Sequence, residues 1–173
     1  KESNPIKKLI AHYSSWHPLQ RALAWIRRFL ALLRNKLRPT WKESRLDVDE
    51  IREARESIIK HIQGESFAEE IRILQKGMVR KQSDKDDQEC KLPKGNRLYR
   101  VEPRLDKQGL LRVGGRSIYP DKTLDDGPIL LPRDHPVVER IVLDTHVFLS
   151  RHSGREHTLA HVRRNYWIMA PRP

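Results

Sequence analysis

The residues in this chain best suited to chemistry are histidines near its C-terminal end. Four of the eight histidines, His146, His152, His157 and His161, fall within seventeen residues. Zinc in structural sites takes four nitrogen or sulfur ligands in a tetrahedron, and two closely spaced histidines at a helix end supply two of them. His146 and His152, with five residues between them, are the predicted metal ligands. The same spacing also suits two polar residues at a helix C-terminus, where a protonated imidazole is mildly favourable.

A rival pair lies a few residues further on. His157 and His161 are four residues apart, but Thr158 between them is predicted to cap the last helix. A capping Thr158 would leave His157 outside the helix, which makes this pair awkward for sharing one ion. His135, which precedes a proline, is expected at a helix start. The remaining histidines are isolated and are interpreted as solvated or capping residues: His12, His17 and His61.

Basic residues surround the histidines. Arg151, Arg155, Arg163 and Arg164 are predicted to contact phosphates of DNA, a role that tolerates different sequences and depends on salt. The whole chain carries 35 Lys and Arg against 23 Asp and Glu, a net charge of +12, which favours a polyanionic partner such as nucleic acid. The excess is mainly N-terminal, with nine basic residues and one acidic residue among residues 1–41. A solvated basic surface is the alternative interpretation.

No motif in the sequence predicts catalysis. The chain has no nucleophile elbow, P-loop or dinucleotide-binding fingerprint. Its clustered acids, Asp47, Asp49 and Glu50 in one place and Asp125 and Asp126 in another, fall at an expected helix cap and in an expected loop, where capping or solvation explains them. We therefore expect no enzymatic activity and no small-molecule substrate.

Composition sets further bounds. The single cysteine, Cys90, cannot form an internal disulfide or a cysteine-rich zinc cluster, and it fits a reducing compartment. The longest apolar run, residues 29–33, is far shorter than the ~20 residues needed to cross a bilayer, and no signal-peptide pattern opens the chain. Because the sequence starts at Lys1 and stops at Pro173 in mid-flow, we expect it to be an interior piece of a longer polypeptide.

A first amphipathic helix is predicted from Trp16 to Leu37, where apolar residues recur at intervals of three and four. Ser15 can cap its start, and Pro39 ends it. Because its apolar stripe is wide, we expect it to pack with the following helices in a bundle or to self-associate. Its other face is basic, so an anionic membrane surface or a calmodulin-like groove is an alternative location.

Two further helices are predicted after the first. Asp47 and Glu50 have the spacing of a capping box, and the helix that they open is expected to end at Gly64. Ser66 and Glu69 repeat this spacing for the next helix. Short connections between amphipathic helices indicate a small bundle or a helical arm whose apolar face needs a partner.

The rest of the chain is predicted to contain both helices and strands. Gly77 is placed to end the third helix, and the polar, aperiodic stretch that follows reads as a flexible linker. Beyond it we expect a hairpin around residues 106–109, a short strand in PILLPRD and a last helix after Thr158. Before that last helix we expect one capped by Asp134, with four apolar residues facing inward: Val137, Val138, Ile141 and Val142. The fold class is thus mainly α with a small β-hairpin (α+β). The expected regions are a helical connector at 1–77, a linker at 78–96, the hairpin and short strand at 97–132, and a C-terminal helical unit at 133–173.

The C-terminal stretch HPVVERIVLDTHVFLSRHSGREHTLAHVRRNYWI resembles the zinc-binding N-terminal domain of retroelement integrases. In that domain a helix ending in His, a loop H-x-G and the pattern T-L-x-x-V-R-x-x-Y-W-I lead to a Cys-x-x-Cys pair. The lead-in LDKQGLLRVGGRSIYPDKTLDDGPILLPRDHP and the helical stretches SSWHPLQRALAWIRRFLALLRNK and ESFAEEIRILQKG look like the same regions of BEL/Pao-type retrotransposon polyproteins. The resemblance covers about residues 14–171, and the order of its segments is as specific as the motifs.

Transferred residue by residue, the resemblance makes His146 and His152 the two histidine ligands of a His-His-Cys-Cys zinc site, with Gly154 in the turn and Thr158 at the start of the next helix. This sequence departs from the family pattern because it has five residues between the histidines instead of four, which places Val147 at the usual ligand position. The family's cysteines would lie about 30 residues past His152, beyond the sequence. The resemblance therefore implies zinc as the cofactor, held here by half a site. Further matches at the end of the last helix are Arg163, Tyr166, Trp167 and Ile168.

The function implied by this resemblance is a non-catalytic DNA-binding and assembly part of a retrotransposon integrase region that supports DNA integration. Its partners would be DNA, other polyprotein or integrase domains, and a second copy of the chain. The carboxylate triad that holds two metal ions in integrases would follow Pro173. The location implied is intracellular, in a cytoplasmic particle and in the nucleus for an active element. The alternative is a structural or protein-interaction connector with a basic amphipathic helix and no metal.

Overall fold

The computed structural model describes residues 4–35, 45–81, 92–114, 127–152 and 154–169. It confirms the predicted class, a mainly helical chain with a small sheet. The helices are α1 (Pro5–His12), α2 (Trp16–Asn35), α3 (Val48–Ser66), α4 (Ala68–Lys81), α5 (Pro136–Asp144) and α6 (Arg155–Asn165), with the 3-10 turn η2 (Tyr99–Val101) and the π-helical turn η4 (Thr145–Leu149). The strands are β1 (Arg104–Leu105), β2 (Leu111–Arg112), β3 (Ile129–Leu131) and β4 (Tyr166–Ile168).

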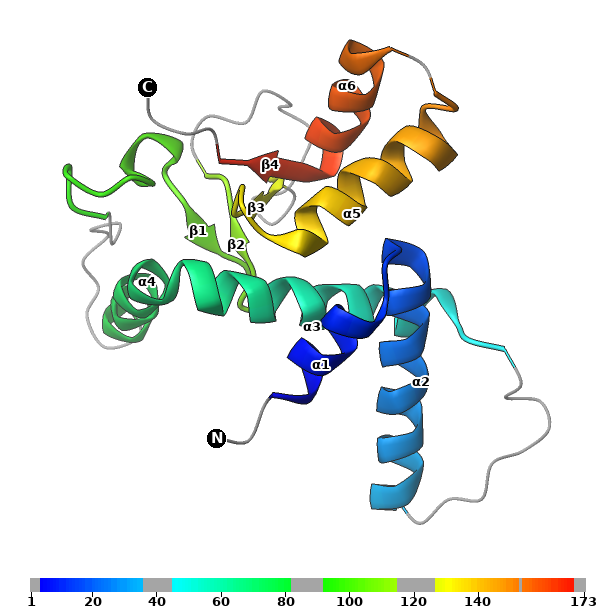
Figure 1. Ribbon diagram of the computed structural model, residues 1–173. Helices are drawn as coiled ribbons and strands as arrows, with labels where there is room; N and C mark the ends of the chain where they lie inside the picture. Colours follow the sequence, from blue (N-terminus) through cyan, green and yellow to red (C-terminus); the bar gives the residue numbers. More distant parts are fainter. Residues whose placement is uncertain (1–3, 36–44, 82–91, 115–126, 153, 170–173) are drawn as a thin grey trace.

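Helix α3 occupies the middle of the molecule (Figure 1). The sheet, α5 and α6 lie on one side of it, and α1 and most of α2 lie on the other. The start of α2 reaches α5, where the His17 N–H donates to Asp144 Oδ2 at 2.9 Å. Among the described helices, none has the length and apolar character required of a membrane span. The predicted metal ligands and DNA-contacting arginines lie on the side of the molecule that holds α5, η4 and α6.

The capping box predicted at the start of α3 is confirmed. The Asp47 side chain accepts from the backbone at the helix start, and Glu50 accepts from the Asp47 N–H at 2.7 Å. Glu50 also pairs with Arg28 of α2, whose Nε donates to Glu50 Oε1 at 2.6 Å. This hydrogen bond from Arg28 holds the pKa of the Glu50 carboxyl below its usual value. The acid pair that opens α3 thus serves the cap and the α2–α3 contact.

Two predicted helix ends were wrong. Helix α3 continues through Gly64 to Ser66, so Ser66 is the last residue of that helix and does not cap the next one. Phe67 takes the C-cap instead and donates its N–H to Gln63 O at 2.7 Å. Helix α4 likewise continues past Gly77 to Lys81, beyond the residue at which the linker was expected to begin. A glycine costs a helix only about 1 kcal/mol, which the packing of the buried α4 face around Gly77 offsets.

The N-terminal helices follow the predicted pattern in part. Helix α2 begins at the predicted Trp16, whereas the predicted end at Pro39 lies outside the described residues. The sequence analysis missed α1, which Asn4 caps by accepting from the Ile6 N–H at 3.0 Å and which buries Ile10. This helix has only eight residues, too few for a clear periodic signal.

The predicted hairpin is confirmed as β1 and β2, which pair antiparallel with Leu105 opposite Leu111. Asp106 makes the turn, because its Oδ1 accepts from the Leu110 N–H at 2.8 Å and its carbonyl accepts from the Gly109 N–H at 2.9 Å. Gly109 has φ +79°, a left-handed conformation that suits glycine. The predicted short strand is also confirmed, as β3.

Strand β4 was not predicted. It pairs parallel with β3, with Ile129 opposite Tyr166 and Leu131 opposite Ile168, and completes a sheet of order β1-β2-β3-β4. Because β4 directly follows α6, this pairing ties the C-terminal helical unit to the hairpin region. The sequence analysis placed these apolar residues at the end of the last helix. They form a strand instead because β3 lies alongside them and pairs with them.

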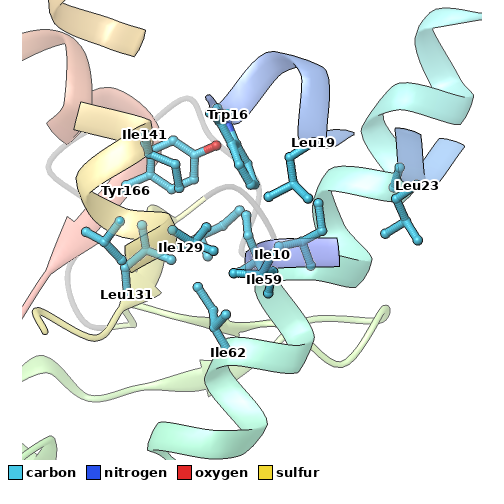
Figure 2. Close-up of a cluster of buried hydrophobic side chains, with 14 of the residues drawn as sticks. Ile10, Trp16, Leu19, Leu23, Ile59, Ile62, Ile129, Leu131, Ile141 and Tyr166 are labelled. Carbon is cyan, nitrogen blue, oxygen red and sulfur yellow. The ribbon is translucent and has the colours of Figure 1, made fainter. Parts of the chain in front are cut away.

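One hydrophobic cluster joins the helices to the sheet. Its members come from α1, α2, α3, α5 and α6 and from both parallel strands, and Figure 2 shows the labelled ones. Three of the four predicted sequence regions contribute to it: 1–77, 97–132 and 133–173. Buried Gln63 of α3 fastens the helix to the sheet, since its Nε2 donates to Leu111 O at 2.8 Å and Leu130 O at 2.7 Å while its Oε1 accepts from the Leu111 N–H at 2.9 Å.

The start of α5 corrects another expectation. His135, not Asp134, is the N-cap, and its Nδ1 accepts from the Val137 N–H at 3.2 Å. Pro136 occupies the first helical position, which leaves the residue just before it as the cap. As predicted, Val137, Val138 and Ile141 face the core.

Candidate metal and DNA-binding site

The π-helical turn η4 brings the two predicted ligands together. His146 lies in this turn, the His152 N–H donates to His146 O at 3.1 Å, and the two imidazole centres are 5.1 Å apart with their planes at 84°. A π-turn holds one residue more than an α-helical turn over the same rise. The turn therefore accommodates the five residues between the histidines, and Val147 within it is exposed.

The distance between the two rings fits shared coordination of one zinc ion. Zn–N bonds of about 2.0–2.1 Å at a tetrahedral angle place two imidazole centres about 5.2 Å apart. The separation of the His146 and His152 rings is 5.1 Å. The separation matches this value, and it is also that of an edge-to-face contact between two rings whose planes lie at 84°.

Thr158 holds the His146 ring, a role that the sequence did not reveal. Its Oγ1 lies 3.0 Å from His146 Nδ1, which leaves Nε2 of that ring as the nitrogen for a metal. Partners of this kind fix the orientation and tautomer of metal-binding histidines. The prediction that Thr158 caps α6 was wrong, because Gly154 is the N-cap and Thr158 lies within the helix and is buried. Instead of capping its own helix, the Thr158 hydroxyl contacts a side chain of η4 that lies twelve residues earlier in the sequence.

The backbone is strained next to the second ligand. Arg151 has φ 45° and His152 has φ 60°, both in the left-handed region. Each such residue other than glycine costs roughly 1–2 kcal/mol. The reversal of direction after η4 is what returns His152 toward His146. Backbone conformations of this kind, which persist only because the surrounding structure holds them, are common at binding sites.

The rival histidine pair is also well formed. His157 lies inside α6, not outside it as expected, because the helix begins at Arg155. His157 and His161 share one helix face at a spacing of four residues, with ring centres 4.6 Å apart and planes at 90°. In the described ranges of the chain, no group of three or more His, Cys, Asp or Glu side chains is arranged to hold a metal. Each histidine pair therefore stands as a two-ligand site.

The four predicted DNA-contacting arginines lie at the two ends of α6. Arg151 and Arg155 are near its N-terminus, Arg163 and Arg164 are in its last turn, and all four are exposed. The ends are about 12 Å apart at 1.5 Å per residue. The last-turn position suits Arg163 and Arg164, because a cation is favoured at the negative end of the helix dipole. The structure thus forms two basic groups along one helix rather than a single patch.

The chain matches no family model, no curated protein and no solved structure. The region of η4 and α6 has two kinds of functional side chain. It offers two imidazole pairs for a soft or borderline metal ion such as zinc, and exposed guanidinium groups for phosphate oxygens. Of the acids considered as catalytic candidates, Asp47 and Glu50 serve the α3 cap, and Asp125 and Asp126 lie outside the described residues.

Proposed function

We propose that this chain is a non-catalytic DNA-binding and assembly part of a retrotransposon integrase region, in which His146 and His152 supply half of a zinc site. The observation that carries the proposal is the pairing of these two rings at 5.1 Å across the π-turn. The motif resemblance names these residues as ligands, and the ring geometry independently suits them to the role. Thr158 supports the assignment by orienting His146 through Nδ1.

Zinc, when bound, would cross-link η4 to the turn before α6 and so stabilise the arrangement of the two helices. The chain's own contribution is to hold the His146 ring by Thr158 and to return His152 toward it through left-handed backbone at residues 151 and 152. With two imidazoles as donors, the affinity of the chain for zinc is weak, because water must complete the tetrahedron.

Nitrogen-specific NMR of the imidazole rings during a Zn²⁺ titration tests this site. We expect signals of His146 and His152 to shift together, with the larger change in His146 at Nε2, because Nδ1 of that ring faces Thr158. Signals that move first or only at His157 and His161 would overturn the assignment and make the α6 pair the site. No response from any histidine would remove zinc from the proposal.

The DNA-binding part of the proposal is supported by the exposed arginines of α6 and by the net charge of +12. Phosphate contacts of this type release counterions, so affinity for duplex DNA falls steeply between ~50 and ~200 mM salt. Changing Arg163 and Arg164 together to Ala weakens binding to all sequences about equally, because phosphate contacts carry no base information.

Fluorescence anisotropy with two unrelated duplexes measures this effect, and Arg21→Ala with Arg34→Ala on α2 serves as the charge-matched control. Both control residues are exposed and lie on a different helix. An equal loss in the control pair would mean that DNA responds only to total charge, which contradicts an α6 interface. Binding that does not change with salt would contradict phosphate contacts altogether.

A second candidate, the protein-interaction connector, is favoured by the exposed part of α2. Phe29 is 60% exposed and Leu33 is 58% exposed, while Ile26 and Leu30 are above 40%. The predicted packing against α3 accounts only for the first half of the helix, where Leu19 and Leu23 are buried. The apolar residues of the second half therefore suit a protein partner or self-association.

Sedimentation velocity over a range of concentrations tests the connector. We expect Phe29→Ser to reduce any self-association, whereas Val48→Ser, a matched change at a 77% exposed position on α3, leaves it unchanged. A monomer at all concentrations would exclude a second copy as the occupant of this face.

A further inference from the structure

A pocket between α3, the sheet and the end of α6 gathers arginines from distant parts of the chain. It measures about 200 Å³, and its walls include Arg55 of α3, Arg112 of β2 and Arg164 of α6. Glu56, Asn165 and Tyr166 also line it. Three guanidinium groups against the carboxylate of Glu56 give the lining an excess of positive charge. Because Arg112 is paired with Asp106, the excess charge of the pocket comes from Arg55 and Arg164 against Glu56.

Arg55 is the residue whose bonding is incomplete. Its Nε is buried, and within the part of the chain that the structure describes it has no hydrogen-bond partner. Leaving a buried charged donor unsatisfied costs more than the loss of an ordinary hydrogen bond. Its guanidinium is not wholly unbonded, since the hydrogen bond and charge of Arg55 lower the pKa of Tyr166, against the larger effect of burial, which raises it.

Arg112 is placed differently. Its Nε is paired with Asp106 at 2.6 Å and its Nη1 donates to Gly127 O at 2.9 Å, so this side chain is held rigidly in the pocket wall. Arg164 is exposed and contributes to the pocket lining from the last turn of α6. The pocket thus combines a cation held by two partners, a partly buried cation with an unused donor, and an exposed cation.

We propose that this pocket binds a phosphate group, with Arg55 as the main ligand, Arg164 closing over it, and Arg112 and the Tyr166 hydroxyl completing the wall. Guanidinium groups match the oxygens of phosphate in geometry and charge. The volume fits a compact oxyanion, because pockets for drug-sized ligands usually measure about 300–1,000 Å³. The proposal goes beyond the histidine site and requires no metal.

A phosphate group has two possible sources, the free ion and the backbone of a nucleic acid. Titration calorimetry of the full chain with inorganic phosphate and, separately, with dimethyl phosphate distinguishes them, since the second compound carries the diester of a nucleic-acid backbone. Binding of both with similar affinity assigns the site to nucleic-acid phosphates, whereas a preference of more than ~10-fold for inorganic phosphate assigns it to the free ion or a phosphate monoester.

Substitutions show whether the pocket carries the binding. We expect Arg55→Gln to weaken phosphate binding by more than ~10-fold and Arg164→Gln by about 3-fold. Arg52→Gln should have no effect, because Arg52 is on the same helix but is exposed and pairs with Asp49 at 2.9 Å. Equal binding in all three variants, or none in the unaltered chain, overturns the proposal. If circular dichroism shows that Arg55→Gln unfolds the chain, the comparison of Arg164→Gln with Arg52→Gln decides the question, because both residues are exposed.

Discussion

The two histidine pairs have similar ring geometry but are held by different parts of the structure. His157 and His161 meet because they are four residues apart on one helix, so any stable helix over this stretch would bring them together. His146 and His152 meet only through a π-turn and two left-handed residues. A pair maintained by tertiary contacts against local strain is the better candidate for a selected function.

A second difference lies in the partners of the rings. His146 has Thr158 at 3.0 Å to fix its orientation. Each pair has one exposed and one partly buried ring, since His152 and His157 are exposed and His146 and His161 are partly buried, so the difference lies in the contact with Thr158. An imidazole whose second nitrogen is already bonded loses less rotamer freedom when it binds a metal. The comparison therefore ranks the η4 pair above the α6 pair as a zinc site, and the following experiments test that ranking.

Removing a ligand should have the largest effect. We expect His152→Ala to lower the zinc affinity of the chain by about 100-fold, at the upper end of what loss of a supporting residue costs. His146→Ala should cause an equal loss, because the π-turn makes the extra residue harmless. Zinc titration calorimetry measures both variants.

The α6 histidines are the matched controls for that experiment. His157→Ala and His161→Ala should leave zinc affinity within about threefold, since neither residue belongs to the η4 pair. A larger loss in either control would reverse the ranking. No loss in His146→Ala would show that the extra residue has removed it from the site.

Removing the orienting hydroxyl should have a smaller effect. Thr158→Val keeps the shape of the buried side chain but cannot hydrogen-bond to His146 Nδ1, and we expect zinc affinity to fall by about 10-fold. Thr158→Ser restores the hydroxyl and should recover most of the affinity. If both variants bind zinc like the unaltered chain, Thr158 has only a packing role.

Deleting the extra residue should change stability modestly and zinc affinity little. Removal of exposed Val147 lets η4 take the commoner α-helical geometry, so we expect the free energy of unfolding to rise while zinc affinity stays within about threefold. Deletion of Leu143, an exposed residue of α5, is the control. This deletion keeps the five residues between His146 and His152, so zinc affinity should stay within about threefold. It also leaves the π-turn in place, so the free energy of unfolding should not rise. A fall in the free energy of unfolding after deletion of Val147 would mean that the π-turn is the preferred geometry of this segment.

A histidine with a structural role gives the smallest effect. Burial is the main cause that holds the pKa of His135 below its usual value, and the neutral ring caps α5 by accepting from Val137. The unfolded chain protonates this histidine near pH 6.5, before the folded chain does, so the folded state loses stability as the pH falls below that value. Thermal unfolding at pH 7.5 and 5.5 measures the loss.

His135→Asn keeps a capping acceptor without a titrating group and should remove that part of the pH dependence. Zinc affinity should not change in this variant, because His135 lies at the opposite end of α5 from η4. An unaltered pH dependence would show that other groups cause it. A fall in zinc affinity would contradict the separation between structural and ligand histidines.

Sequence signals were reliable where neighbouring residues decide the structure. The capping box at Asp47, the hairpin turn at Asp106 and Gly109, and the apolar face of α5 all depend on bonds or spacings within a few residues. The same reasoning failed at Gly64 and Gly77, because the small preference of glycine for helix ends is outweighed by packing along α3 and α4.

Contacts between distant residues could not be predicted. Gln63 appears in the sequence as one polar residue of an amphipathic helix, yet it is buried and bonds to two strands that come 48 and 67 residues later. Strand β4 has the composition of a helix end until β3 pairs with it. The arginines of the phosphate pocket are likewise separated in sequence, at positions 55, 112 and 164.

The sequence by itself determined the fold class, the capping box at Asp47 and the hairpin turn at Asp106, and it supplied the histidines and arginines discussed above. Only the tertiary structure decided which of them meet. The spacing of His146 and His152 has one residue too many for the motif, and it is the docking of α6 against η4, with Thr158 reaching His146, that turns this spacing into a pair. Local propensity contributes a few tenths of a kcal/mol per residue, whereas buried contacts contribute more, so packing chooses among the conformations that the sequence permits.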